Sequence, residues 1–149
     1  MLRICLEKDF LLGEAGLFTC TLYWQTDEGA FPSDDWTDFA GVLLKWWTDA
    51  YFALEYSSAA EFLFMDGPYR IRACRAGNSA LCSFMRDGMF VRSDQAIELD
   101  ELRDALLCAV RRLKSGLTQG GRDEEAAQAG ELMMRLKIAA GSLQSQPSV

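Results

Sequence analysis

Adjacent carboxylates come nearest to a catalytic pattern in this chain. Asp34-Asp35 and Asp100-Glu101 are neighbours in the sequence, and two carboxyl groups can share the work of a general acid and a general base. Both pairs, however, stand where a helix is expected to begin, and the positive end of a helix dipole stabilises ionised carboxylates. Neither pair would then keep the proton that a general acid donates. The sequence therefore favours a non-catalytic role for both.

Other catalytic arrangements are missing. The chain contains no histidine, which excludes Ser-His-Asp and Cys-His catalysis and His-ligated metal sites. No lysine stands at a recognisable spacing from a serine or cysteine nucleophile. The patterns GxxxxGK[ST] and GxGxxG, which bind nucleotide phosphates, do not occur. We therefore predict that the protein is not an enzyme and that it uses no cofactor or metal ion.

The cysteines are scattered, with no C-x-x-C pair, and stand at Cys5, Cys20, Cys74, Cys82 and Cys108. The odd number and the wide spacing argue against a disulfide framework or a zinc site. Mainly apolar or strand-like neighbours predict small buried hydrophobic residues at Cys5, Cys20, Cys74 and Cys108. Reduced thiols indicate a reducing compartment, and we expect the cytoplasm. We expect no export signal and no membrane-spanning helix, which needs roughly 18 apolar residues.

Negative charge is concentrated in the first part of the chain. Residues 1–60 hold ten acidic and three basic residues and residues 61–149 hold twelve of each, so the first part carries the whole net charge of -7. Five acids fall within twelve positions, namely Asp27, Glu28, Asp34, Asp35 and Asp38. Helix capping and a solvated loop explain two or three of them. An acidic surface attracts basic proteins by long-range steering and does not suit nucleic-acid binding.

Aromatic and arginine residues give two further indications. Tyr23 and Phe52 are candidate apolar anchors beside the acidic residues, because interface hot spots are often aromatic. Arg70 and Arg72, two positions apart, share one face of a predicted strand, where they could bind phosphate or carboxylate. The alternative interpretation of these arginines is a solvated sheet face that discourages edge aggregation.

Alternation of polar and apolar residues predicts the strands. Residues 2–10 and 17–26 form a predicted hairpin with a turn at residues 13–16. A meander follows, with strands at residues 61–66, 69–76, 79–86 and 89–92 and a short extended segment at residues 97–99. Gly77-Asn78 and Asp87-Gly88 supply its tight turns, because primed turns need residues that tolerate positive φ.

Three helices are predicted from apolar periodicity. The first begins at Ser33 or Asp35, either of which can cap it, with Lys45 and Thr48 on its polar face. Its wide apolar stripe includes Trp36, Trp46 and Trp47. The second is capped by Asp100 and ends at Gly116, and the third spans residues 122–141.

This order of elements predicts an α+β fold. We expect an antiparallel sheet of five or six strands, built from hairpin, helix and meander. The Trp-rich helix and the C-terminal helices would pack on one face of this sheet. A single domain would span residues 1–143, with a flexible tail at residues 144–149.

The arrangement resembles small bacterial immunity proteins, which accompany polymorphic or contact-dependent toxins. The resemblance covers roughly residues 17–115. It is carried by layout and a few aromatic anchors: Tyr23-Trp24-Gln25-Thr26-Asp27-Glu28-Gly29, Phe31-Pro32, Trp36-Thr37-Asp38-Phe39, Trp46-Trp47, the strand-turn-strand segment Phe62–Tyr69, and Ile97–Leu102.

The resemblance implies a cytoplasmic antidote that binds a cognate toxin domain and blocks its substrate or active site. Many such toxins are nucleases, whose substrate channels are basic, and an acidic surface can occupy such a channel. Two alternatives stay open: a small-molecule-binding or enzymatic domain that uses Arg70 and Arg72, and a chaperone or adaptor for a secreted effector.

Overall fold

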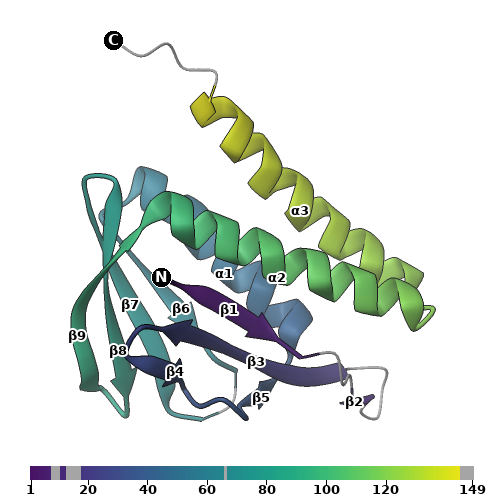
Figure 1. Ribbon diagram of the computed structural model, residues 1–149, viewed down its shortest axis with the longest axis horizontal. Helices are drawn as coiled ribbons and strands as arrows, with labels where there is room; N and C mark the ends of the chain where they lie inside the picture. Colours follow the sequence, from purple (N-terminus) through teal and green to yellow (C-terminus); the bar gives the residue numbers. More distant parts are fainter. Residues whose placement is uncertain (8–10, 13–17, 66, 145–149) are drawn as a thin grey trace.

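The computed structural model describes residues 1–7, 11–12, 18–65 and 67–144 (Figure 1). Over these residues the chain forms antiparallel strands and three helices, which confirms the predicted α+β class. The strands are β1 (Arg3–Leu6), β2 (Leu11–Leu12), β3 (Phe18–Thr26), β4 (Gly29–Phe31), β5 (Thr37–Asp38), β6 (Ala59–Leu63), β7 (Tyr69–Ala76), β8 (Ser79–Arg86) and β9 (Met89–Glu98). The helices are α1 (Ala40–Tyr56), α2 (Leu99–Gln119) and α3 (Asp123–Gln144). The predicted turn at 13–16 and residues 145–149 of the predicted tail lie outside the described residues.

β3 organises the first sheet and follows the predicted alternation. Its side chains are buried and half-buried in turn along the whole strand, as expected of a strand with one face on the core. β1 pairs antiparallel with β3, and Leu6 lies opposite Leu22, which confirms the predicted hairpin pairing. β4 and β5 also pair antiparallel with β3.

The meander forms a sheet of its own, so the prediction of one sheet with five or six strands is wrong. In the described part of the chain, β6, β7, β8 and β9 pair in that order, and β2, β4 and β5 join β1 and β3 in the other sheet. Trp24 of β3 lies opposite both Ile4 of β1 and Phe31 of β4. Both edges of β3 are therefore occupied where the meander would have to join.

The meander itself largely follows its prediction, although β6 (Ala59–Leu63) begins and ends earlier than the predicted strand at residues 61–66, whose last residue lies outside the described residues. β7 and β8 have the predicted bounds, whereas β9 is longer and joins the predicted segments 89–92 and 97–99 into one strand. Asp87 (φ 53) and Gly88 (φ 77) both have positive φ, as a two-residue type I′ turn requires.

The first helix begins later than predicted. α1 starts at Ala40, its N-cap residue Phe39 makes no side-chain capping hydrogen bond, and its first turn contains no acidic residue. The predicted caps at Ser33 and Asp35 are therefore wrong. Thr37 and Asp38 pair with β3 instead, which keeps this segment extended until Phe39.

The tryptophans fall into three environments. Trp24 and Trp47 are fully buried, Trp36 packs half-buried against the core from its place before α1, and Trp46 is 38% exposed. Trp46 was predicted on the buried stripe, yet it is the exposed one of the four. Thr48 was predicted on the polar face, yet it is fully buried. α1 contacts β6, β3, α2 and α3, so its buried arc is wider than one stripe and includes Thr48.

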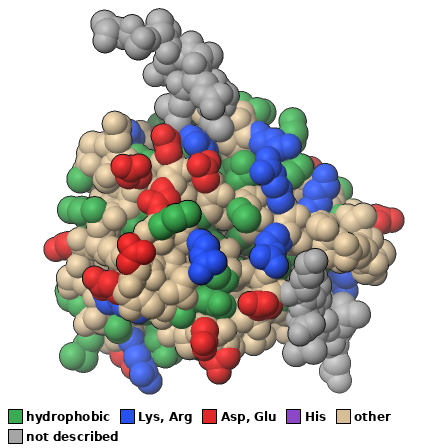
Figure 2. Space-filling view, in the orientation of Figure 1, with side chains coloured by type: hydrophobic (Ala, Val, Ile, Leu, Met, Phe, Trp, Pro, Cys, Tyr) green, Lys and Arg blue, Asp and Glu red, His purple; other side chains and the backbone are tan. Residues whose placement is uncertain are grey.

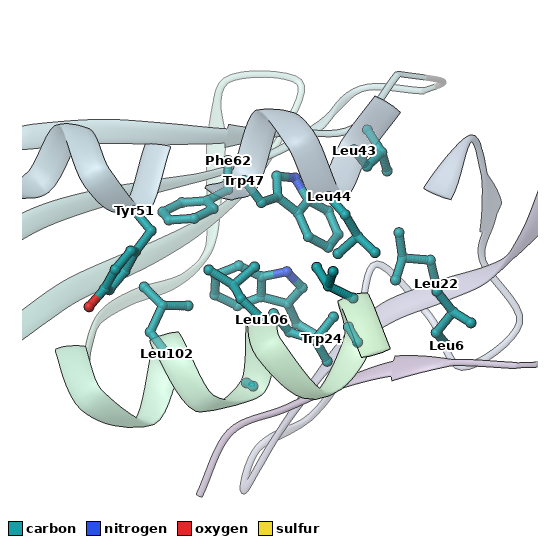
Figure 3. Close-up of a cluster of buried hydrophobic side chains, with 14 of the residues drawn as sticks. Leu6, Leu22, Trp24, Leu43, Leu44, Trp47, Tyr51, Phe62, Leu102 and Leu106 are labelled. Carbon is teal, nitrogen blue, oxygen red and sulfur yellow. The ribbon is translucent and has the colours of Figure 1, made fainter. Parts of the chain in front are cut away.

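The core joins both sheets to the helices. Trp24 meets Trp47 and Phe62 edge-on, with ring centroids 5.8 Å and 5.1 Å away, a favourable geometry for aromatic pairs. Figure 3 shows how these rings converge from both sheets and α1, with Leu102 and Leu106 reaching them from α2.

The last two helices pack against each other. α2 starts directly after β9, with Glu98 rather than the predicted Asp100 at its N-cap, and passes the predicted end at Gly116 to reach Gln119. α3 confirms the predicted last helix to within a turn at each end. None of the described helices has an apolar stretch long enough to cross a lipid bilayer.

Candidate protein-binding surface

Asp34 and Asp35 lie exposed on the loop between β4 and β5, which we call the acidic loop (residues 33–36). The hydroxyl of Ser33 donates a hydrogen bond of 2.7 Å to Asp35 Oδ1. Among the described residues, no lysine or arginine forms an ion pair with either aspartate. Their negative charge is therefore available to a partner.

Asp27 and Glu28 form the tip of the hairpin between β3 and β4. The amino group of Met1 donates a hydrogen bond of 2.9 Å to Asp27 Oδ2, and this contact is the main cause that raises the pKa of that amino group. The amide of Glu28 donates to Thr26 Oγ1. Tyr23, whose pKa the charge of Asp34 helps to raise, lies four positions before Asp27, or roughly 13 Å away at the usual rise of a strand. The five acids therefore do not form one compact cluster.

Asp38 is not part of the exposed surface. It is 1% exposed, so its assignment as a partner-binding residue is wrong. Oδ2 accepts hydrogen bonds from Trp36 Nε1 at 3.1 Å and from the Met65 amide at 3.2 Å, and Oδ1 accepts one from the Phe39 amide at 2.8 Å. A buried carboxylate needs such partners, and here it fixes the acidic loop to the start of α1 and the end of β6.

The two predicted aromatic anchors have different surroundings. Tyr23 lies half-buried on the outer face of β3. The pKa of Tyr23 is raised mainly by this partial burial, and further by its hydrogen bond with Cys5 and the nearby charges of Glu7 and Asp34. The charge of Asp34 is thus close enough to act on the Tyr23 hydroxyl. Phe52 packs half-buried against the core, and the guanidinium carbon of Arg135 lies 5.0 Å from its ring centroid.

The sequence reasoning missed an acidic region at the start of α2. An open cavity of about 700 Å³ lies between β1 and this helix, and its charged lining includes four acids and two arginines: Glu98, Asp100, Glu101, Asp104, Arg3 and Arg112. The hairpin tip reaches the same region, because the Met1 amino group that pairs with Asp27 lies 3.9 Å from Glu101 Oε1. Figure 2 shows acidic side chains gathered on this side of the molecule. The pair Asp100-Glu101 was the available sequence signal, but its position beside Asp27 depends on the fold.

Arg103 reduces the charge of that region. Its guanidinium is nearly buried and lies 3.1 Å from both Asp100 and Asp104. Arg3, Arg112 and the Met1 amino group also line the cavity. The region at the start of α2 therefore carries much less net negative charge than its acidic residues alone suggest.

The arginines of the meander all have partners within the molecule. Arg70 and Arg72 each lie 3.6 Å from Glu61, and neither lines the cavity beside β1. Arg75 donates to the carbonyl oxygens of Leu54 and Gly77. The guanidinium carbon of Arg86 lies 5.7 Å from the Tyr69 ring centroid, and Arg92 donates to the hairpin at residues 26–30.

The cysteines differ in burial. Burial raises the pKa of Cys20 and of Cys82 to about 12, with a smaller contribution from Asp38 and Cys74 respectively. Cys74 and Cys108 are exposed, so the prediction that both are buried is wrong. In the part of the chain that the structure describes, no group of three or more cysteine, aspartate or glutamate side chains is placed to hold a metal ion.

No protein-family model, curated protein or solved structure matches this chain.

Proposed function

We propose that the protein is a non-catalytic antidote that neutralises a cognate bacterial toxin domain through its acidic surfaces. The observation that carries the proposal is the exposed, unpaired negative charge of Asp34 and Asp35 in the described structure. Asp27, Glu28 and the acids at the start of α2 add a second acidic region. These charges would steer a basic partner toward the molecule.

The resemblance to immunity proteins suggests the nature of that partner. A toxin that acts on nucleic acid needs a basic channel for a polyanion, and carboxylates on a folded domain can occupy such a channel. In this proposal the protein acts in the cytoplasm, where an incoming toxin would reach its substrate.

The alternative that Arg70 and Arg72 bind a small molecule gains no support. Both guanidinium groups face Glu61, which already supplies a carboxylate.

A co-expression experiment tests the proposal. Immunity genes usually neighbour their toxin genes, so the proposal predicts a large secreted protein encoded immediately upstream. Its C-terminal domain should arrest growth when produced alone, and growth should recover when the present protein is produced with it. Growth arrest that persists despite comparable amounts of both proteins would contradict the proposed role.

A further inference from the structure

Trp36 and Tyr69 form an aromatic pair at the end of the molecule that carries the acidic loop. Their ring centroids lie 5.1 Å apart at an interplanar angle of 79°, and both side chains are only partly buried against the core. The guanidinium carbon of Arg86 lies over the Tyr69 ring, 5.7 Å from its centroid, and Arg86 lies opposite Met89 in the pairing of β8 with β9.

Asp38 holds this surface in place. One of its oxygens accepts hydrogen bonds from both the Trp36 indole and the Met65 amide, so a single buried group orients two residues of the surface. Gly67 lies directly against the ring: it has φ +83, and a Cβ there would come within 2.7 Å of the Trp36 indole. The position of Trp36 is therefore set before any partner arrives, which reduces the entropy lost on binding.

The composition of the surface is that of a protein interface. Met65 is 41% exposed and Met89 is 74% exposed, and Asp34 and Asp35 stand next to Trp36 in the chain. Aromatic residues, methionine and arginine are enriched at interfaces, and tryptophan, tyrosine and arginine dominate binding hot spots.

Charge indicates the occupant. Asp34 and Asp35 have no cation partner in the described residues, whereas Asp27 pairs with Met1 and Arg103 pairs with two acids of α2. The excess negative charge of Asp34 and Asp35, which precede Trp36 in the chain, therefore favours a basic group. Aromatic rings also attract guanidinium groups, as Arg86 over Tyr69 shows within this molecule.

This inference rests on the proposed function. We propose that the acidic loop and the Trp36–Tyr69 pair form the site at which the protein recognises its toxin. A basic side chain of the toxin, preferably arginine, stacks on Trp36 and places its positive charge against Asp34 and Asp35. The start of α2 then contributes long-range steering and makes little contact.

Nuclear magnetic resonance with short charged peptides tests this assignment. The probes are acetylated, amidated tetra-arginine, tetra-lysine and tetra-glutamate, and the readout is the set of backbone and indole N–H resonances. We expect tetra-arginine to shift the Trp36 indole and Tyr69 saturably, tetra-lysine to do so more weakly, and tetra-glutamate to have no effect. The double variant Asp34→Asn/Asp35→Asn should bind tetra-arginine about fivefold more weakly, as expected for two exposed charge contacts. The variant Glu124→Gln/Glu131→Gln on α3, with the same change in charge, should bind normally.

The contradicting outcomes are distinct. Tetra-arginine shifts confined to residues 27–28 and 98–104 would overturn the Trp36 site while leaving the proposed acidic binding function intact. Equal responses to tetra-arginine and tetra-glutamate would contradict both. Concentration-dependent shifts of Trp36 without peptide would assign the surface to a second copy of this chain and overturn the site.

Discussion

Arg92 of β9 donates a hydrogen bond to the carbonyl oxygen of Gly29 in β4, and this contact joins the two sheets. The same guanidinium donates to Thr26 Oγ1 and to the Ala30 carbonyl oxygen, and its carbon lies 5.6 Å from the Phe84 ring centroid. It thereby anchors the hairpin that carries Asp27.

Arg92→Lys should destabilise the protein by about 2 kcal/mol, because an ammonium group cannot reach three acceptors and stack on a ring at once. Urea denaturation measures the change. Arg72→Lys, which alters a half-exposed pair with Glu61, is the matched control and should change the free energy of unfolding by less than about 0.5 kcal/mol. Equal effects of the two substitutions would show that Arg92 does not join the sheets.

Asp38→Ala should destabilise the protein by at least about 3 kcal/mol, because it leaves the N–H groups of Trp36, Phe39 and Met65 without their acceptor. Asp38→Asn should cost less, since one amide oxygen still accepts. Asp35→Ala is the control, because Asp35 is exposed and its carboxylate accepts a hydrogen bond from the nearby Ser33 hydroxyl. A loss below about 1 kcal/mol for Asp38→Ala would contradict the structural role of this carboxylate.

Thr48→Val should stabilise the protein by about 1 kcal/mol. Thr48 Oγ1 is buried and has no hydrogen-bond partner among the described residues, and valine keeps the shape while removing the unsatisfied hydroxyl. Thr48→Ser keeps the hydroxyl but removes a buried methyl group, so it should destabilise by about 1 kcal/mol. Thermal unfolding compares the two variants, and a valine variant less stable than the parent would indicate that the hydroxyl has an acceptor.

Thiol reactivity should separate the cysteines by burial. At pH 8, Ellman's reagent should modify Cys74 and Cys108 first in the native protein, because both are exposed. Cys20 and Cys82 should react only on unfolding, because they are buried and their pKa is raised to about 12. Mass spectrometry of digested protein identifies the modified residues, and early labelling of Cys82 would contradict the described core.

The same thiols predict a pH dependence of stability. The pKa of Cys20 and Cys82 rises from 9.0 to about 12 in the folded protein, so the unfolded chain releases these protons at lower pH than the folded chain. Their effect on stability is therefore absent below pH 9, and the free energy of unfolding should fall as the pH rises from 9 toward 12. The variant Cys20→Ala/Cys82→Ala should show a shallower fall. If the free energy of unfolding of this variant fell as steeply with pH as that of the parent, titratable groups other than Cys20 and Cys82 would cause the fall.

Local sequence patterns predicted the strands of the meander and the alternation of β3, because these depend on neighbouring residues and on turn chemistry. The separation into two sheets was not predictable in the same way, since it arises from the double pairing of Trp24 with Ile4 and Phe31. The late start of α1 has the same origin: β5 pairs with β3 and overrides the capping pattern at Ser33 and Asp35.

The candidate site was predictable only as a region. The concentration of acids identified the exposed Asp34 and Asp35, but composition cannot distinguish them from Asp38, whose burial depends on contacts with Met65 across 27 residues. Apolar periodicity extends to Trp36, four residues before the first residue of α1. The sequence therefore predicted Trp36 on the buried stripe of the helix rather than on a surface.

The rate of association with the toxin domain that the proposal expects to be encoded upstream tests the central claim most directly. In stopped-flow measurements at low salt, a variant that combines Asp34→Asn and Asp35→Asn with Glu101→Gln should associate about tenfold more slowly, and added salt should remove the difference. Glu124→Gln/Glu131→Gln should associate like the parent. Equal association rates for the surface variant and the parent at low salt would contradict the account that exposed negative charge guides this protein to a basic partner.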